Sequence, residues 1–347
     1  MSKYLTLTVL LLSLSMPVHA QQIGEIELKE SGFGQKKLSK APKKIFISEF
    51  NINYQLAYSQ TSIARGGREL GGGYRGDATA SLSVAIPDID LNELQKITDR
   101  AYEDFVSTLK AKGFEIVEPD VAAQTELLSD WERLPGGQIS EAQFPGYIAT
   151  MPSGRDFFVR RITKKGRTKN GVFEYATKLS KQLDGAIIVK MNLAIPFVEE
   201  AEGGVSKSLR KTIGGLAKVV VKPNFRLANY ESVQVSQTNT LTIQTNSSYI
   251  YMESLKDQAQ VQHALKKDVE IGGVFEDKKY KATQKADQDL WGSGNGFYTV
   301  FSYDDRELEK TQAIPCDPQK YLSGVGQVIS GYVKNSLNGF LEAYESK

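Results

Sequence analysis

Apolar residues recur every three or four positions between Asp88 and Val117, and this spacing predicts an amphipathic helix. One face of that helix carries five apolar residues: Leu94, Ile97, Ala101, Phe105 and Leu109. Asp90 is placed to cap the first turn, and Gly113 to end the helix in a left-handed conformation. Residues 114–117 then read as a short strand. A helix of this length needs tertiary packing, so the pattern predicts a sheet beneath it.

Other segments have the patterns expected of the strands of that sheet. Lys44–Phe50 and Ala186–Ile195 are apolar runs that predict buried strands, the second of them central. Alternation of polar and apolar residues predicts a hairpin with arms at Asn51–Tyr58 and Ala78–Ile86 and a glycine-rich tip. Apolar residues at odd positions between Val219 and Met252 predict two or three more antiparallel strands.

Four further segments have helical spacing: 121–134, 172–183, 254–267 and 318–345. The last is long and amphipathic, and a glycine-rich turn with a strand at 297–301 precedes it. These elements predict an α/β (α+β) fold. We expect a mixed sheet with helices packed on it, long antiparallel hairpin insertions and a C-terminal amphipathic helix.

The first twenty residues have the pattern of a secretory signal peptide. Lys3 precedes an apolar run, and small residues at Val18 and Ala20 frame a cleavage site. We therefore expect export to the periplasm or outer membrane, with secretion also open. The expected organisation is a signal peptide at 1–20, a mobile lead-in at 21–41, an α/β domain at 42–200 with its hairpin insertion at 51–86, and antiparallel strands plus the last helix at 201–347.

Composition excludes several classes of function. The formal net charge is +2, which together with export argues against nucleic-acid binding. The single cysteine, Cys316, cannot form an intrachain disulfide and reads as a buried apolar residue. Beyond residue 20 the chain keeps one histidine, His263, which we expect to be exposed on a polar helix. Histidine relays and multi-histidine zinc sites are therefore disfavoured, and we expect no catalytic residue, cofactor or metal.

Paired carboxylates leave an alternative open, because glycoside hydrolysis needs only two of them at a suitable separation. The candidate pairs are Glu199 with Glu200, Asp304 with Asp305, and Asp88 with Asp90. Neighbouring residues on a strand point to opposite faces, which disfavours the first two pairs. The alternative function is a soluble periplasmic or secreted glycan-binding protein, or a carboxylate-based hydrolase.

A basic cluster lies between residues 138 and 170. Its candidate anion-contacting residues are Arg160, Arg161, Lys164, Lys165 and Arg167. Such a cluster suits lipid phosphate or an acidic polymer, and it equally suits a solvated loop.

The order of elements resembles a known family over about residues 43–200. The matching segments are the strand Lys44–Phe50, the helix Ile97–Lys112, the strand Phe114–Glu118 with its Val-Glu end, the helix Val121–Leu134 and the strand entry Leu183–Val189. This order is similar to the periplasmic domain of the curli-secretion-channel (CsgG-like) family, and more broadly to the N-terminal domain of TolB-type periplasmic proteins. The resemblance implies hairpins that line an oligomeric outer-membrane pore without catalysis.

The first hypothesis is therefore a non-enzymatic exported envelope protein that acts in assembly, secretion or surface-polymer export. Its expected partners are copies of itself and other envelope proteins, with peripheral or integral outer-membrane association. The apolar face of the hairpin is the candidate partner or lipid surface: Tyr54, Leu56, Tyr58, Leu82 and Val84. The same alternation also suits an ordinary half-buried antiparallel sheet.

Overall fold

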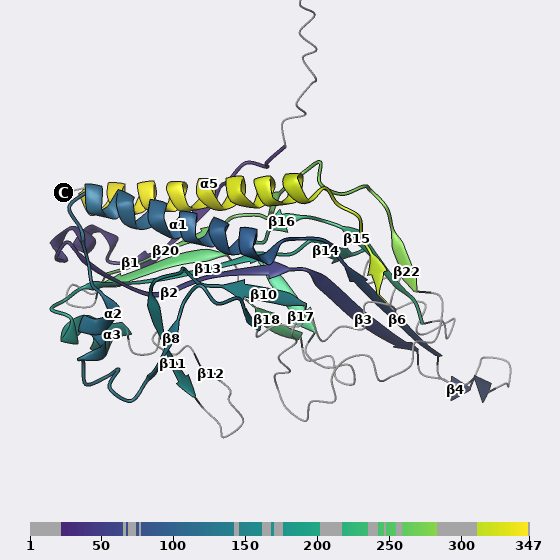
Figure 1. Ribbon diagram of the computed structural model, residues 1–347, viewed down its shortest axis with the longest axis horizontal. Helices are drawn as coiled ribbons and strands as arrows, with labels where there is room; N and C mark the ends of the chain where they lie inside the picture. Colours follow the sequence, from purple (N-terminus) through teal and green to yellow (C-terminus); the bar gives the residue numbers. More distant parts are fainter. Residues whose placement is uncertain are drawn as a thin grey trace, which may run out of the picture.

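A computed structural model shows the predicted α/β architecture, in which helices cover a mixed sheet and hairpins extend from one of its ends (Figure 1). The structure describes residues 22–64, 67–68, 74–75, 78–141, 146–161, 168–169, 176–201, 217–234, 242–245, 248–254, 259–282 and 311–345.

The main sheet has eight strands: β1 (Leu28–Phe33), β2 (Lys44–Gln55), β7 (Glu115–Ile116), β9 (Ser140–Glu141), β10 (Tyr147–Thr150), β13 (Ile187–Ile195), β19 (Tyr249–Ser254) and β20 (Ala259–Leu265). Their order is β1-β20-β19-β13-β2-β10-β9, and β7 also pairs with β2. β13 lies between β2, which is parallel to it, and β19, which is antiparallel. This confirms that the most apolar segment of the chain is a central strand.

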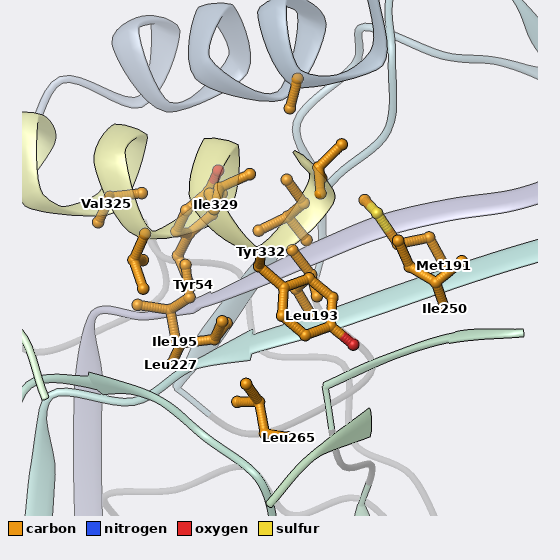
Figure 2. Close-up of a cluster of buried hydrophobic side chains, with 14 of the residues drawn as sticks. Tyr54, Met191, Leu193, Ile195, Leu227, Ile250, Leu265, Val325, Ile329 and Tyr332 are labelled. Atoms are coloured by element: carbon orange, nitrogen blue, oxygen red, sulfur yellow. The ribbon is translucent and has the colours of Figure 1, made fainter. Parts of the chain in front are cut away.

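Two long helices, α1 (Leu91–Ala111) and α5 (Pro318–Glu345), lie side by side on the first face of this sheet (Figure 1). Both fall where the helical spacing predicts them. Tyr332 and Ile329 of α5 are fully buried, and they face Leu193 and neighbouring strand residues in a continuous apolar core (Figure 2). Burial of this interface stabilises α5 despite its internal glycines.

The ends of α1 follow from two residues that the sequence singles out. The Asp90 carboxylate accepts a hydrogen bond from the backbone N–H of Asn92 at 2.8 Å. Gly113 has φ +82°, a conformation that ends the helix and directs the chain into β7.

The second face of the sheet carries α2 (Pro119–Ala123), α3 (Ala176–Gln182) and the small sheet β12-β11-β8. The predicted helix over 121–134 is wrong beyond Ala123, since turns and then β8 (Glu132–Pro135) follow. β8 pairs with β11 (Asp156–Arg161), which in turn pairs with β12 (Thr168–Lys169). This long-range pairing outweighs the local helical spacing.

The described residues of the predicted lead-in, 21–41, include regular structure that the sequence pattern does not predict. Residues 28–33 form edge strand β1, and Gln35–Lys40 form a 3-10 helix, η1, in which Leu38 is fully buried. An edge strand pairs on one side only and tolerates charged residues, so β1 has no apolar alternation.

The predicted helix over 254–267 is strand β20. Its buried residues are Ala259, Val261, His263 and Leu265, which alternate with more exposed ones. This period of two fits a strand with one face in the core. It also places His263 in the interior, contrary to the expectation that it is exposed.

Two hairpins form a small two-layer structure beyond the end of the main sheet. The first, β3 (Ala57–Ala64) with β6 (Ala78–Ala85), begins later than predicted, because Asn51–Gln55 belong to β2. The second joins β14 (Val198–Glu200) to β15 (Val219–Pro223). The two sheets of this structure are β23-β6-β3 and β14-β15-β22, with β22 at Tyr280–Ala282 and β23 at Gln312–Ala313.

Further short strands follow the period-two pattern predicted before Met252. They form the pairs β16 (Arg226–Leu227) with β21 (Val269–Glu270) and β17 (Glu231–Gln234) with β18 (Thr242–Thr245). At the glycine-rich tip, β4 (Gly67–Arg68) pairs with β5 (Tyr74–Arg75). The other tip residues, the predicted signal peptide, residues 172–175 and the predicted strand 297–301 lie outside the described residues.

The predicted division at residue 200 does not separate two structural units. β19, β20 and α5 come from the second segment, yet they complete the sheet and helix layer begun by the first. None of the helices in the described ranges combines the length and apolarity needed to cross a membrane.

Candidate functional site

The second face of the main sheet, away from α1 and α5, carries polar side chains on its three central strands. We call this set the polar layer: Glu49, Asn53 and Gln55 on β2, Lys190 and Asn192 on β13, and Tyr249, Tyr251 and Glu253 on β19. The register places Lys190 between Glu49 and Tyr251, and Asn192 opposite Tyr249. Six of the eight residues are buried, whereas a polar sheet face is ordinarily solvated.

A β-bulge sets the position of Glu49. The register of β2 against β13 shifts between Val189 and Lys190, so that Ser48 is the additional residue. Before the bulge, Ile45 and Ile47 face the helix layer, and after it Phe50 and Ile52 do. The change of phase turns Glu49 to the second face. Bulges that re-aim a side chain are frequent beside functional sites.

Glu49, Lys190 and Tyr249 form the charged centre of the polar layer. Lys190 Nζ lies 2.8 Å from Glu49 Oε2, and the Tyr249 hydroxyl interacts with the same ammonium group. Burial raises the pKa of Glu49, although attraction to Lys190 opposes the shift. Burial acts to lower the pKa of Lys190, but Glu49 and Tyr249 outweigh it and the pKa is raised. The Lys190 ammonium group therefore stays charged, whereas burial disfavours the ionised form of the Glu49 carboxyl beside it.

Amide groups continue the polar layer next to this centre. Asn53 Nδ2 donates to Asn192 Oδ1 and to the Leu193 carbonyl, both at 3.1 Å. Gln55 Oε1 accepts from the backbone N–H of Phe197 at 3.1 Å. These bonds fix the orientation of both amides of β2.

Two polar atoms of the polar layer are buried without a hydrogen-bond partner. Among the described residues, neither Glu49 Oε1 nor Asn192 Nδ2 has a hydrogen-bond partner. Glu49 is 4% exposed and Asn192 is 6% exposed, so solvent does not readily replace the missing bonds. Each such atom costs about 1–3 kcal/mol, which calls for a specific explanation.

A second carboxyl lies at the far end of β19. Glu253 Oε2 accepts a hydrogen bond from the Tyr251 hydroxyl at 2.8 Å. Burial raises the pKa of Glu253, and the Tyr251 hydroxyl offsets part of that shift. No group of three or more His, Cys, Asp or Glu side chains in the described ranges is arranged to hold a metal. The polar layer is thus a set of hydrogen-bond donors and acceptors of nearly balanced charge.

The hairpin residues predicted as a partner or lipid surface lie inside the chain instead. Tyr54 and Leu56 are fully buried in the main core, and the Tyr54 hydroxyl lies 3.2 Å from Thr98 Oγ1. Leu82 and Val84 are buried and belong to the same core, and Tyr58 is half-buried against it. The strands β15 and β22 contact β6 on this face. The apolar face that the alternation predicts is present, and the chain itself buries it.

The carboxylates that the sequence offers for glycoside hydrolysis have structural roles where the structure describes them. Glu199 Oε1 lies 2.9 Å from Lys222 Nζ, and Gln60 donates to Glu200 across the two hairpins. Burial acts to raise the pKa of Glu199, but Lys222 and Asn224 outweigh it and lower the pKa. Asp90 caps α1, and Asp88 has a positive φ of 63° in the turn before it. Asp304 and Asp305 lie outside the described residues.

The predicted basic cluster is described only in part. Arg160 and Arg161 belong to β11, where their backbones pair with Lys169 and Thr168. Lys164, Lys165 and Arg167 lie outside the described residues. Anion contact by this cluster therefore stays a prediction.

His263 and Cys316 are both poorly suited to chemistry. His263 is 1% exposed, and burial lowers its pKa although Glu30 Oε2 lies 3.4 Å from its Nε2. Cys316 is half-buried, and burial raises the pKa of its thiol to about 11. A thiol with so high a pKa is a poor nucleophile.

The polar layer is not predicted by the sequence, because its residues come from three strands that are far apart along the chain. Asn53 and Gln55 fall on the polar side of a predicted hairpin arm, and Lys190 and Asn192 interrupt an apolar run. A comparison of the polar positions of neighbouring strands could have brought these residues together. The bulge at Ser48, which turns Glu49 to this face, is not indicated by any pattern in the sequence.

Comparisons with known proteins add no assignment: no family model, no curated protein and no solved structure matches the chain. Inferences about function therefore depend on the arrangement of the described elements.

Proposed function

We propose that this chain is a non-enzymatic exported envelope protein that assembles with copies of itself through its hairpin end. In this role it acts in assembly, secretion or surface-polymer export. The arrangement of the two hairpins carries the proposal, and the resemblance to the curli-secretion-channel family points the same way.

The two hairpins leave the main sheet at the same end and lie together. β2 and β13 are adjacent and parallel, and β2 leads into β3 while β13 leads into β14 (Figure 1). The hairpin sheets contact each other through β15, β3 and β6, and Gln60 of the first hairpin donates to Glu200 of the second. A shared apolar core, including Leu82 and Val221, supports both hairpin bases. The fold thus places two hairpins next to each other at one end of the main sheet, on a shared apolar core.

The face of the first hairpin opposite Leu82 is the surface that we assign to contact between copies. It is half-buried and polar, with Thr61 and Ser81 side by side at 2.9 Å between hydroxyl oxygens. Ser59 and Ser83 form a second such pair at 3.1 Å. Hydroxyl pairs are uncharged and permit close packing, and a contact repeated by rotation closes a ring.

The experiment measures membrane retention and mass together. Membranes of the native host are extracted with carbonate and then mild detergent, and the detergent extract is sized by light scattering. We expect carbonate-resistant protein whose mass is several times that of one chain. A monomer released by carbonate would overturn the proposal.

A charged variant then tests the assigned surface. Thr61→Glu/Ser81→Glu should reduce the assembly to monomers, because two added carboxylates repel in a close contact. The control, Ser107→Glu/Ser129→Glu, adds the same charge at exposed positions on α1 and in the turn before β8, and should leave the assembly intact. Equal assembly of both folded variants would rule out this face.

A further inference from the structure

We propose that the edge strand β1 is an interface at which two copies of this chain pair antiparallel and join their main sheets into one. The proposal goes beyond assembly through the hairpins and does not depend on it. Among the described residues, β1 pairs with β20 on one side and has no strand on the other. All of its residues after Leu28 are exposed.

The hydrogen bonds between β1 and β20 show which backbone groups of β1 point outward. The Lys266 N–H donates to the Glu27 carbonyl at 3.0 Å, and this pair continues the register of the two strands. Bonded and non-bonded pairs alternate along an antiparallel ladder. The backbone N–H and C=O groups of Leu28, Glu30 and Gly32 therefore point away from β20. Such a row of outward groups is a template for another strand.

Charge selects one register for a second copy. Outward residues must lie opposite outward residues, so the two-fold registers that pair most of β1 are centred on Glu30 or on Ser31. The first places two Glu30 carboxylates directly opposite each other, which is destabilising. The second places Ser31 opposite Ser31, Glu30 opposite Gly32, and Lys29 opposite Phe33. No like charges are opposite each other in this second register, so we assign it to the interface.

The register centred on Ser31 also covers an exposed aromatic ring. Phe33 is 53% exposed. Lys29 of the second copy would lay its alkyl stem along this ring and place its ammonium group near the ring face. Glu30 lies opposite Gly32, which has no side chain to compete for space, and each such pair can exchange two backbone hydrogen bonds. The interface is small, which favours a weak dimer.

Disulfide trapping tests the register. Cys316→Ser removes the only native thiol, and Ser31→Cys, Glu30→Cys or Ser107→Cys is added to this chain. Each purified protein is oxidised with oxidised glutathione at a protein concentration of about 100 μM. Opposed residues of an antiparallel pair have Cβ atoms about 4.5–5.5 Å apart, close to disulfide distance. We expect Ser31→Cys to form a covalent dimer at least about tenfold faster than Ser107→Cys, which is exposed on α1 and reports random collision.

Two outcomes of the trapping would overturn the proposal. One is dimerisation of Ser31→Cys at the rate of Ser107→Cys, and the other is faster dimerisation of Glu30→Cys than of Ser31→Cys. Adding Thr61→Glu/Ser81→Glu to the Ser31→Cys chain should leave its rate unchanged. A failure of the hairpin contact is therefore distinguishable from a failure of the β1 contact.

A proline then tests the backbone hydrogen bonds themselves. Glu30→Pro removes one outward N–H from each copy, and an edge strand tolerates proline at such a position. Analytical ultracentrifugation in the Thr61→Glu/Ser81→Glu background should show a dimer at least about tenfold weaker than that of Glu30→Ala, which keeps the N–H. Equal dimerisation of Glu30→Pro and Glu30→Ala would overturn the proposal, as would a Glu30→Ala chain that is monomeric up to about 1 mM. If Glu30→Pro does not fold, the trapping rates decide.

Discussion

Gly339 on α5 lies directly against the imidazole ring of His263 on β20. A Cβ atom at position 339 would be 3.2 Å from Cε1 and 3.3 Å from Nε2 of that ring. The absence of a side chain therefore lets the last helix approach the sheet at this point. The glycine weakens the helix locally, but it permits a close contact with β20.

The first prediction contrasts this glycine with another on the same helix. Gly339→Val should lower the free energy of unfolding by about 2 kcal/mol, because its side chain would overpack the space occupied by His263. Gly326 has no atom within 4 Å of its Cβ position, so Gly326→Ala should raise the free energy of unfolding by up to about 1 kcal/mol. Urea unfolding measures both. Similar effects of the two changes would contradict the packing argument.

The second prediction concerns Arg155, which fills the gap between β7 and β10 beside β2. Its Nη2 donates to the carbonyls of Ile47 and Val117 at 3.2 and 3.3 Å, and its side chain is buried. Arg155→Met should cost about 2–4 kcal/mol, since two buried carbonyls lose their donor. The control, Arg133→Met, removes partly exposed ion pairs to Asp120 and Asp156 and should cost about 1 kcal/mol or less. Equal losses would show that Arg155 has no special role.

The third prediction is a pH dependence that originates at His263. Burial lowers its pKa in the folded chain, so protonation favours the unfolded state. Its contribution to stability is complete above the ordinary histidine pKa of about 6.5 and is lost as the pH falls through that value toward the folded pKa. The nearest carboxylate, on Glu30, opposes the shift.

His263→Gln should therefore make stability less dependent on pH between about 7 and 5 than in the wild type. Glu30→Gln should make it more dependent, because the carboxylate that favours protonated His263 is removed. Chemical unfolding at several pH values measures both slopes. An unchanged slope in His263→Gln would show that other groups, such as Glu253, control this range.

Local periodicity predicted the elements whose burial follows one simple pattern. α1, α5 and β13 match their predicted segments because their apolar residues repeat at helical spacing or without interruption. The predicted helix at 254–267 failed because Val261, His263 and Leu265 follow a period of two that a polar composition concealed. Edge strand β1 was not predicted for a related reason. Its charged residues are exposed, so the strand shows no apolar alternation.

The candidate site was less predictable than the fold. Glu49, Lys190 and Tyr249 are far apart in sequence and meet only because β2, β13 and β19 are neighbours. The bulge at Ser48 further reverses the alternation on which a strand prediction depends. The hairpin illustrates another limit of sequence patterns. Alternation identifies its apolar face, but only the folded structure shows that β15 and β22 cover this face.

The fourth prediction tests the ion pair at the centre of the polar layer. Lys190→Met should lower the free energy of unfolding at neutral pH by about 3–5 kcal/mol, because it leaves the buried Glu49 carboxylate unpaired. The double change Glu49→Gln/Lys190→Met removes that charge as well and should cost less than the single change. A double-mutant cycle from urea unfolding measures the coupling.

Lowering the pH should reduce the loss of stability caused by Lys190→Met. Burial raises the pKa of Glu49, and loss of the lysine should raise it further. A carboxyl whose folded pKa exceeds its unfolded value takes up a proton first in the folded state, so its contribution to stability rises as the pH falls through the folded pKa. The difference between wild type and Lys190→Met should therefore shrink from pH 7 toward pH 5, whereas a purely steric defect would be the same at both pH values.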